Sequence, residues 1–213
     1  MFTGIIGAIG AIKAVAPLID AANSGVRLLV DAASLDLSDV ALGDSIAING
    51  ACMTAVELDL AAGTFAVDVS FESLSKTAGL TQIGAVNLEK AMRLSDRLGG
   101  HMVSGHVDDV AQIVRFEPVA ESFELVFTAP LKWRRFISDK GSVTLHGTSL
   151  TVNRTWVEDD AVLGTINLIP HTMAHTVFQY LNVGDKINLE IDLLARYVDQ
   201  LMNKNDDASY TSM

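Results

Sequence analysis

Two short segments of the chain place a reactive or hydrogen-bonding side chain two residues before a threonine. Cys52 precedes Thr54, and Ser149 precedes Thr151. Both segments alternate as a β-strand does, and residues two apart in a strand face the same side, so each pair shares one face. Such a pair can supply a nucleophile or hold a polar ligand, or it can make local hydrogen bonds as small buried residues. Because the same polar pair recurs in both segments, a catalytic or ligand-binding role is favoured over a purely structural one.

Two histidines, His101 and His106, follow a pair of glycines near the middle of the chain. The sequence around His106 repeats the pattern of the N-terminus, and His106 stands where the first copy has Ile5. A histidine titrates near neutral pH and can act as an acid or a base, so the two copies differ at a chemically meaningful position. The spacing of the two histidines and Asp108 matches no established ligand motif, and no metal site is predicted.

The pattern changes after Asp192. Apolar residues then recur at helical spacing, at Leu193, Leu194, Tyr197, Val198, Leu201 and Met202. This spacing predicts an amphipathic helix over residues 193–203, and its apolar stripe indicates self-association because no barrel is left for it to cover. Asp192 itself is either the N-cap of this helix or a charged group aimed into a cleft. Residues 204–213 are predicted to be a disordered tail.

The second half of the chain repeats the first at an offset of about one hundred residues. Besides the two similar starting segments, three pairs of segments match in the same order. Gly141–Thr151 matches Asp44–Thr54, Ile166–Thr172 matches Val67–Ser73, and Val183–Glu190 matches Ile83–Glu89. Matches in one order at one spacing are hard to obtain by chance, and they indicate an internal duplication.

Each copy contains about six short strand-like runs with turn signals between them and almost no helix. Asn49-Gly50 is a strong hairpin signal, because both residues tolerate positive φ and two strand-like runs flank them. Units of this kind close as small antiparallel barrels, which removes exposed strand edges. The sequence therefore predicts an all-β protein with one barrel in residues 1–97 and a second in residues 98–192.

Composition excludes several classes of partner. The formal net charge is −11, which argues against nucleic acid because phosphate binding needs a concentrated positive surface. No apolar run reaches the ~18 residues that cross a bilayer, so no membrane partner is predicted. Cys52 is the single cysteine, which fits a reducing cytoplasm. The glycines near the N-terminus do not form a dinucleotide fingerprint, and the absence of a Lys/Arg cluster argues against a phosphorylated ligand.

Five segments together carry a resemblance to a known family. They are Met1-Phe-Thr-Gly-Ile-Ile, Asn49-Gly50 with Cys52-Met-Thr54, Gly99-Gly-His-Met-Val-Ser-Gly-His106, Gly147-Thr-Ser-Leu-Thr151 and Asn167-Leu-Ile-Pro-His-Thr172. With these segments the chain resembles riboflavin synthases of the α-chain type, from Met1 to about Leu201. The departures are mild. Met53 stands where leucine is usual, and at the position of Phe71 the family often has proline or another residue.

The resemblance implies two similar six-stranded antiparallel Greek-key barrels followed by a C-terminal helix, assembled as a homotrimer. It implies a dismutation in which two molecules of 6,7-dimethyl-8-ribityllumazine exchange a four-carbon unit. The products are riboflavin and 5-amino-6-(D-ribitylamino)uracil, and neither cofactor nor metal takes part. The active site of the family lies between the N-terminal barrel of one subunit and the C-terminal barrel of another. Lumazine synthase is a further candidate partner.

The resemblance also implies which residues form the two pockets. The N-terminal pocket is expected to contain Gly4, Ile5, Ile6, Ser45, Cys52, Met53, Thr54, Asp68, Val69, Ser70, Phe71, Glu72 and Ser73. The C-terminal pocket is expected to contain His106, Val107, Asp108, Lys140, Ser149, Leu150, Thr151, Asn167, Leu168, Ile169, Pro170, His171 and Thr172. The reaction needs a base for the C7 methyl group of one lumazine and a nucleophile for the other. The expected contributors are His106, Cys52, Ser45, Thr151 and Asp192.

A different class of function remains open beside the enzyme. Some relatives in this superfamily only bind lumazine or flavin, as optical antenna proteins, and have lost active-site residues in one repeat. Both repeats keep their polar residues here, which favours the enzyme. A flavin-dependent reductase on a similar barrel would need a nucleotide domain, for which the chain has no room.

Overall fold

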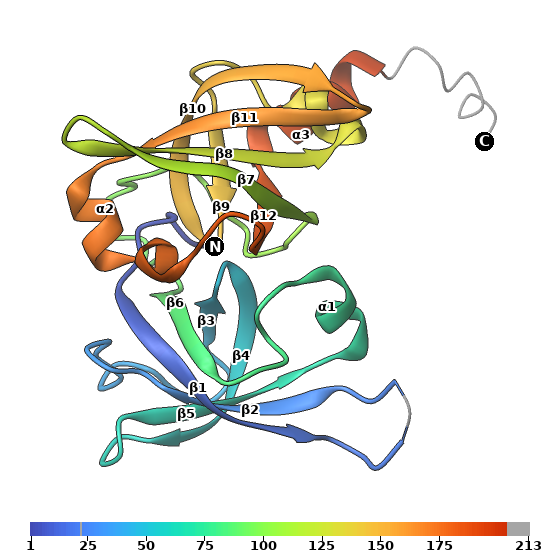
Figure 1. Ribbon diagram of the computed structural model, residues 1–213. Helices are drawn as coiled ribbons and strands as arrows, with labels where there is room; N and C mark the ends of the chain where they lie inside the picture. Colours follow the sequence, from blue (N-terminus) through green and yellow to red (C-terminus); the bar gives the residue numbers. More distant parts are fainter. Residues whose placement is uncertain (22, 204–213) are drawn as a thin grey trace.

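The computed structural model describes residues 1–21 and 23–203. Within them the backbone forms two closed six-stranded antiparallel barrels and a C-terminal helix, which confirms the predicted all-β duplicated architecture. In Figure 1 the first barrel lies below the second. No helix in this part of the chain is both long and apolar enough to span a membrane.

The first barrel follows the strand order β1-β2-β5-β4-β3-β6 and closes where β6 pairs with β1. Its elements are β1 (Ala8–Pro17), β2 (Val26–Asp31), β3 (Ser45–Ile48), β4 (Ala51–Asp59), β5 (Thr64–Val69), α1 (Phe71–Lys76) and β6 (Gly84–Lys90). Residues 1–7 thus precede the first strand of the barrel, and α1 follows β5 after Ser70.

The second barrel repeats this order with β7, β8, β11, β10, β9 and β12. Its elements are β7 (Asp109–Val119), β8 (Ser122–Pro130), η1 (Leu131–Phe136), β9 (Ser142–Leu145), β10 (Thr148–Glu158), β11 (Ala161–Leu168), α2 (Pro170–His175), η2 (Val177–Tyr180) and β12 (Lys186–Ile191). Register shifts recur at equivalent places, after Ile12 in β1 and after Ile113 in β7. Such shifts sharpen the local twist and help a short sheet to close.

The barrels meet through two equivalent hairpin turns. Asn49 and Gly50 join β3 to β4, and His146 and Gly147 join β9 to β10; all four residues have positive φ. The side-chain amide of Asn87 donates to the His146 carbonyl at 2.8 Å, and that of Asn188 donates to the Asn49 carbonyl at 2.9 Å. The glycines lie so close that a Cβ at position 50 would sit 2.6 Å from the Gly147 nitrogen. Backbone packing across this junction therefore requires glycine in both turns.

His146 lies in this junction and is only 4% exposed. Its Nδ1 accepts a hydrogen bond from the Asn188 backbone N–H at 3.1 Å, just as Asn49 Oδ1 accepts from the Asn87 N–H. Burial lowers the pKa of His146 to about 4. The ring is therefore neutral at pH 7, and the proton of its neutral form is on Nε2 because Nδ1 is an acceptor.

The buried neutral His146 is expected to make the protein acid-sensitive. Its pKa is about 4 in the folded chain against 6.5 in an unfolded one, so the unfolded state binds a proton first and stability falls as the pH drops below 6.5. The loss between pH 7.5 and pH 5 is about 2 kcal/mol in the free energy of unfolding. His146→Asn keeps a side-chain acceptor for Asn188 and should remove this part of the loss, as urea unfolding at both pH values would measure. The exposed His175→Asn is the control, and equal acid sensitivity of both variants would contradict the prediction.

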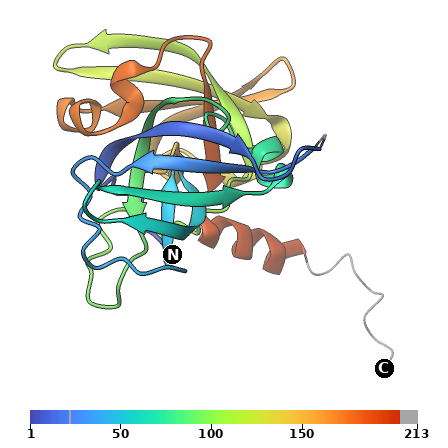
Figure 2. The ribbon, with the colours of Figure 1, turned by 90° about the horizontal axis from the view of Figure 1, so that it is seen from below.

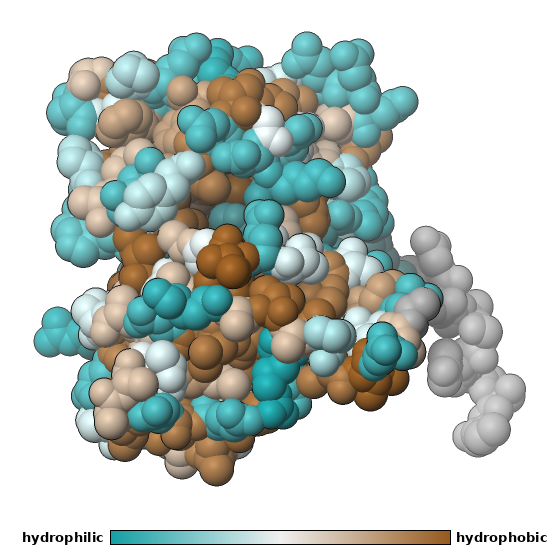
Figure 3. Space-filling model, turned by 60° about the horizontal axis from the view of Figure 1, so that its bottom comes forward, coloured by the Kyte–Doolittle hydropathy of each residue, from teal (hydrophilic) through white to brown (hydrophobic). Residues whose placement is uncertain are grey.

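The C-terminal helix α3 (Leu193–Met202) projects from the barrels (Figure 2). Asp192 Oδ1 accepts from the Leu194 backbone N–H at 2.9 Å, so Asp192 is the N-cap. Five apolar side chains of the helix are more than half exposed: Leu194, Tyr197, Val198, Leu201 and Met202. Figure 3 shows hydrophobic side chains gathered beside the end of the described chain. The tail predicted over residues 204–213 lies outside the described residues.

Candidate active site

Two segments precede the barrels, which we call the N-terminal arm (residues 1–7) and the middle arm (residues 102–108). They pair with each other through Phe2 and Val103, whose backbones exchange hydrogen bonds of 2.7 and 3.1 Å. Beyond this bridge each arm contacts the barrel of the other repeat. The Gly4 carbonyl accepts from the Ser149 N–H at 2.7 Å, and the Gly105 carbonyl accepts from the Cys52 N–H at 2.8 Å.

Each arm lies between the two barrels and contacts both. Gly4, Ile5 and Ile6 were expected in the N-terminal pocket; the Gly4 N–H donates to Glu89 of the first barrel, and the Gly4 carbonyl accepts from Ser149 of the second. His106 and Val107 were expected in the C-terminal pocket; both line the pocket of Cys52, and the neighbouring Gly105 N–H donates to Glu190 of the second barrel.

The contact of each arm with the opposite barrel requires glycine. A Cβ at position 4 would sit 2.6 Å from the Ser149 Cβ, and a Cβ at position 105 would sit 2.6 Å from the Cys52 Cβ. Gly4 and Gly105 also have φ of +73° and +80°, a region that side chains with a Cβ rarely adopt. The two glycines therefore let the arms approach the reactive side chains closely.

A buried glutamate holds each arm. Glu89 accepts from the Thr3 N–H and Oγ1–H at 2.7 Å each and from the Gly4 N–H at 3.0 Å. Glu190 accepts from the Ser104 N–H at 2.6 Å, from its Oγ–H at 2.7 Å and from the Gly105 N–H at 3.0 Å. Burial raises the pKa of both carboxyl groups, against the opposing effect of these hydrogen bonds. Each glutamate thus fixes the arm that carries Ile5 or His106.

The first reactive group lies in a pocket of about 210 Å³ between β4, α1 and the middle arm, here called the Cys52 pocket. Cys52 is half-buried and His106 is exposed. The predicted residues brought together here are Cys52, Met53, Glu72, Ser73, His106 and Val107, joined by Ala51, Lys76, Thr77 and Gly105. A thiol, an imidazole and an ammonium group around one small hollow can bind a polar ring and move protons.

Other residues predicted for this pocket lie outside its lining. Ser45 is paired with Thr54 across β3 and β4, and it lines a separate hollow beside Lys90. The Asp68 carboxylate forms a two-bond ion pair with Arg27, at 2.7 and 2.9 Å, and Arg27 holds the pKa of Asp68 below its ordinary value. Asp68 is therefore engaged on the surface of β5.

The second reactive group, which we call the Ser149 site, is built around a histidine that the sequence reasoning did not select. His101 Nδ1 lies 2.7 Å from Ser149 Oγ, and His101 Nε2 lies 3.1 Å from Thr144 Oγ1. Burial lowers the pKa of His101, although the negative charge of Asp192 raises it. The neutral ring can accept the Ser149 proton on Nδ1 while its Nε2–H donates to Thr144, which is an arrangement suited to general-base activation of a hydroxyl.

The described part of the first repeat lacks the two hydroxyl groups of this triad. Ala47 and Cys52 occupy the positions of Thr144 and Ser149. The signal in the sequence was the glycine pair before His101. A Cβ at Gly100 would sit 2.2 Å from the Thr3 carbonyl oxygen and 2.6 Å from the Ser149 Cβ, so glycine is what brings the histidine into contact.

The remaining residues predicted for the C-terminal pocket are spread around the Ser149 site. Asp108 is bound to Arg196 and to the Ile191 N–H, so it anchors α3 to the barrel. Lys140 Nζ lies 3.5 Å from Asn153 Oδ1 on the outer surface. Thr151 shares the outer face of β10 with Ser149. Asn167 and Leu168 end β11, and Ile169 is the N-cap of α2. Within α2, Pro170, His171 and Thr172 occupy the places of Phe71, Glu72 and Ser73. Residues 1–21 and 23–203 contain no group of three metal-binding side chains.

Comparison with known proteins gives a consistent result across nearly the whole chain. The lumazine binding domain model matches twice, at residues 3–91 and 104–192. The chain is 43% identical to riboflavin synthase of Photobacterium phosphoreum over 207 residues, which is 95% of this chain and 89% of that protein. It is 37% identical to riboflavin synthase of Bacillus subtilis, over 97% of this chain and 92% of that protein.

The chain belongs to the riboflavin synthase family. Among solved structures it is similar to LumP complexed with riboflavin, with a TM-score of 0.77 and 21% identity over 90% of this chain and 99% of that chain. LumP complexed with 6,7-dimethyl-8-(1'-D-ribityl) lumazine gives a TM-score of 0.73 at 20% identity. At this identity the likeness shows the fold alone. The two matches to the lumazine binding domain correspond to the two barrels of the structure.

Proposed function

We propose that this chain is a riboflavin synthase. It converts two molecules of 6,7-dimethyl-8-ribityllumazine into riboflavin and 5-amino-6-(D-ribitylamino)uracil by transfer of a four-carbon unit. The observation that carries the proposal is the identity of 43% to a riboflavin synthase over 95% of the chain. The reaction needs two copies of one molecule in different roles. The Cys52 pocket and the Ser149 site are two equivalent places with different reactive groups.

The chemistry can be divided between these two places. At the Ser149 site, His101 takes the proton of Ser149, and the hydroxyl acts as nucleophile or as proton carrier toward one lumazine. At the Cys52 pocket, His106 and the Cys52 thiol act on the acidic C7 methyl group of the other lumazine. Thr151 and Asp192 assist at the Ser149 site, Thr151 through its position beside Ser149 and Asp192 through its charge near His101. Ser45 contributes from the separate hollow beside Lys90, on β3, which pairs with the strand of Cys52.

A turnover assay tests the proposal directly. Purified protein mixed with 6,7-dimethyl-8-ribityllumazine should form one riboflavin for every two lumazines consumed, measured by chromatography. Cys52→Ala and His106→Ala should each lower turnover at least tenfold, because a positioned acid, base or nucleophile contributes roughly 10²–10⁴ to a rate. Lys13→Ala, on the far exposed surface of β1, is the control. Full turnover in both variants would contradict the assigned roles, and tight binding without conversion would favour an antenna protein.

We also propose that the active protein is a homotrimer whose copies meet through α3. The exposed apolar side chains of this helix support the proposal, and so does the need to bring two pockets face to face. In that assembly the Cys52 pocket of one subunit faces the Ser149 site of the next. Proximity of the two bound lumazines then supplies much of the rate.

Removal of the helix should abolish this assembly. A chain that ends after Asp192 should sediment as a monomer, because the exposed stripe formed by Tyr197 and Leu201 is lost. The truncation also removes the ion pairs of Asp108 with Arg196 and of Arg135 with Asp199, so a full-length Leu201→Glu variant, which keeps both pairs, is the matched control. Trimers in both proteins would exclude α3 as the contact. Association with lumazine synthase and location in the cytoplasm stay predictions.

A further inference from the structure

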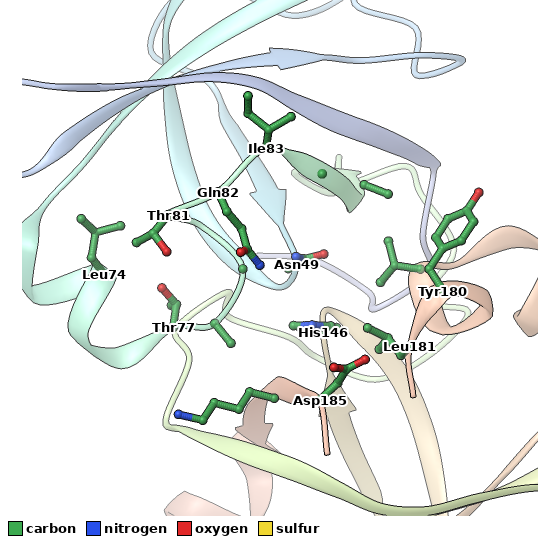
Figure 4. Close-up of a pocket in the computed structure, with 16 residues that line it drawn as sticks. Asn49, Leu74, Thr77, Thr81, Gln82, Ile83, His146, Tyr180, Leu181 and Asp185 are labelled. Atoms are coloured by element: carbon green, nitrogen blue, oxygen red, sulfur yellow. The ribbon is translucent and has the colours of Figure 1, made fainter. Parts of the chain in front are cut away.

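A cavity of about 460 Å³ lies between the two barrels and is separate from the Ser149 site (Figure 4). It is enclosed by residues 77–85, which follow α1, and by residues 177–186, which include η2. The hairpin turns that carry Asn49 and His146 form its deepest part. The cavity shares only Thr77 with the Cys52 pocket. Its volume lies within the ~300–1,000 Å³ of small-molecule sites and suits one or two rings.

Two N–H donors face this cavity without a partner among the described residues. Asn49 is 3% exposed and uses its Oδ1 to accept from Asn87, but its Nδ2 makes no hydrogen bond to that part of the chain. His146 is 4% exposed and uses its Nδ1 to accept from Asn188, which leaves the Nε2–H unpaired. No fully buried polar side-chain atom of the described chain lacks a partner, so both nitrogens retain some accessible surface, and both residues line the cavity. Two nearly buried N–H donors at the base of the cavity require a hydrogen-bond acceptor there.

The walls indicate which kind of acceptor fits. Both donors are neutral, and the nearby Asp185 and Lys186 carry opposite charges, so the cavity offers no excess positive charge to an anion such as phosphate. The apolar side chains of Leu74, Leu181 and Tyr180 stand on opposite sides of the cavity and suit a flat ring (Figure 4). An uncharged ring that bears carbonyl oxygens can accept hydrogen bonds from both donors and pack between the apolar side chains.

We infer that this cavity is a second ligand site, which binds a small uncharged heterocycle through its carbonyl oxygens. Asn49 Nδ2 and His146 Nε2 donate to the ring, and the Gln82 side chain, which points toward the middle of the cavity in Figure 4, closes over it. The site lies on the pseudo-symmetry axis, because Asn49 and His146 occupy equivalent turns of the two repeats. It therefore takes one molecule per chain, whereas each barrel has its own reactive surface. The inference does not depend on catalysis.

The experiment uses full-length protein labelled with ¹⁵N-histidine and titrated with uracil and with pteridine-2,4-dione. The ring Nε2–H of His146 reports directly on the base of the cavity. A saturable shift of this signal is expected with either compound, and inorganic phosphate should leave it unchanged. Asn49→Asp should weaken the binding at least tenfold, because the carboxylate still accepts from Asn87 and tolerates positive φ but has lost the donor. Gln82→Trp fills the cavity from its exposed rim and should abolish the shift.

Asn153→Asp, at an exposed position of β10, is the matched control for the added charge and should bind as the original chain does. The inference is overturned if neither ring compound shifts the His146 signal up to its solubility limit. It is also overturned if Asn49→Asp and Gln82→Trp bind as well as the control, or if phosphate gives the stronger shift. Turnover of the lumazine measured on the same samples keeps this result separate from the outcome of the catalytic assay.

Discussion

Replacement of Glu190 by alanine is expected to lower turnover at least a hundredfold, because this glutamate positions the middle arm and with it His106. The variant leaves the backbone N–H of Ser104, its hydroxyl and the N–H of Gly105 without their buried acceptor. A displacement of about 1 Å in a positioned group can cost roughly a hundredfold in rate. Stability should fall by only about 2 kcal/mol, since the unsatisfied donors destabilise the variant while the cost of burying a carboxylate disappears. Turnover and urea unfolding measure the two effects.

The reactivity of Cys52, the single cysteine, reports on the position of the middle arm. A merely structural role of Glu190 would leave this reactivity unchanged. Gly105 covers Cys52 and accepts the hydrogen bond of its backbone N–H. A loosened middle arm should therefore raise the rate at which a thiol reagent modifies Cys52, by at least fivefold in Glu190→Ala. Glu89→Ala is the matched variant, since it frees the N-terminal arm at the Ser149 site instead, and its thiol rate should stay unchanged. Equal thiol rates in the two variants would show that the glutamates do not act on separate arms.

Glu190→Gln should cause a smaller loss of turnover and of thiol protection than Glu190→Ala. The amide oxygen can accept both hydrogen bonds from Ser104, whereas the amide nitrogen then faces the Gly105 N–H as a second donor. Turnover and thiol protection should lie between those of the original chain and of Glu190→Ala. A glutamine variant as impaired as the alanine variant would mean that the negative charge, rather than the geometry of the acceptor, governs the arm.

The substitution Gly147→Ala is expected to destabilise the protein strongly, although it adds only one methyl group. The new Cβ would sit 2.7 Å from the Gly50 nitrogen and 2.9 Å from the Gly50 Cα, and neither backbone atom can move without separating the barrels. The φ of +81° adds strain of about 1 kcal/mol. We expect a loss on the order of 4 kcal/mol in the free energy of unfolding, measured with urea, with overpacking as the larger part.

Gly184→Ala separates overpacking from backbone strain. Gly184 has a φ of +97°, but no described atom lies within 4 Å of an added Cβ. It should lose only the ~1 kcal/mol of backbone strain. Gly50→Ala should behave as Gly147→Ala does. The double variant should lose less than the sum of the two, since the first methyl group already separates the turns. Additive losses, or a loss in Gly184→Ala equal to that in Gly147→Ala, would contradict the steric explanation.

Much of the fold follows from features that are local in the sequence. The Asn49-Gly50 turn, the alternation of β4 and the apolar stripe of α3 each depend on neighbours within a few residues, and the structure confirms the barrels and the helix that they predict. The duplication was visible because residues near Thr54 and Thr151 match directly. Internal repetition thus predicted two similar barrels, whereas their Greek-key arrangement was implied by the resemblance to the family.

The sites were harder to predict because their contacts join distant parts of the chain. His101 meets Thr144 and Ser149 across 43 and 48 residues, and no spacing rule connects them. The positions of the arms were hard to predict for a related reason. Gly4 contacts Glu89 of one barrel and Ser149 of the other, and both partners are far from it in the sequence.

The two arms also affect the order in which the protein can fold during synthesis. The first barrel is complete in sequence once Lys90 has been made, yet the surface around Cys52 stays uncovered until Gly105 leaves the ribosome. The N-terminal arm, which is made first, can bind Glu89 as soon as the first barrel forms, but its contact with Ser149 must wait for the second barrel. The contact of Cys52 with Gly105 spans 53 residues (105 − 52), that of Gly4 with Ser149 spans 145 (149 − 4), and closing such long loops slows folding. The surface around Cys52 can therefore be completed before the surface around Ser149.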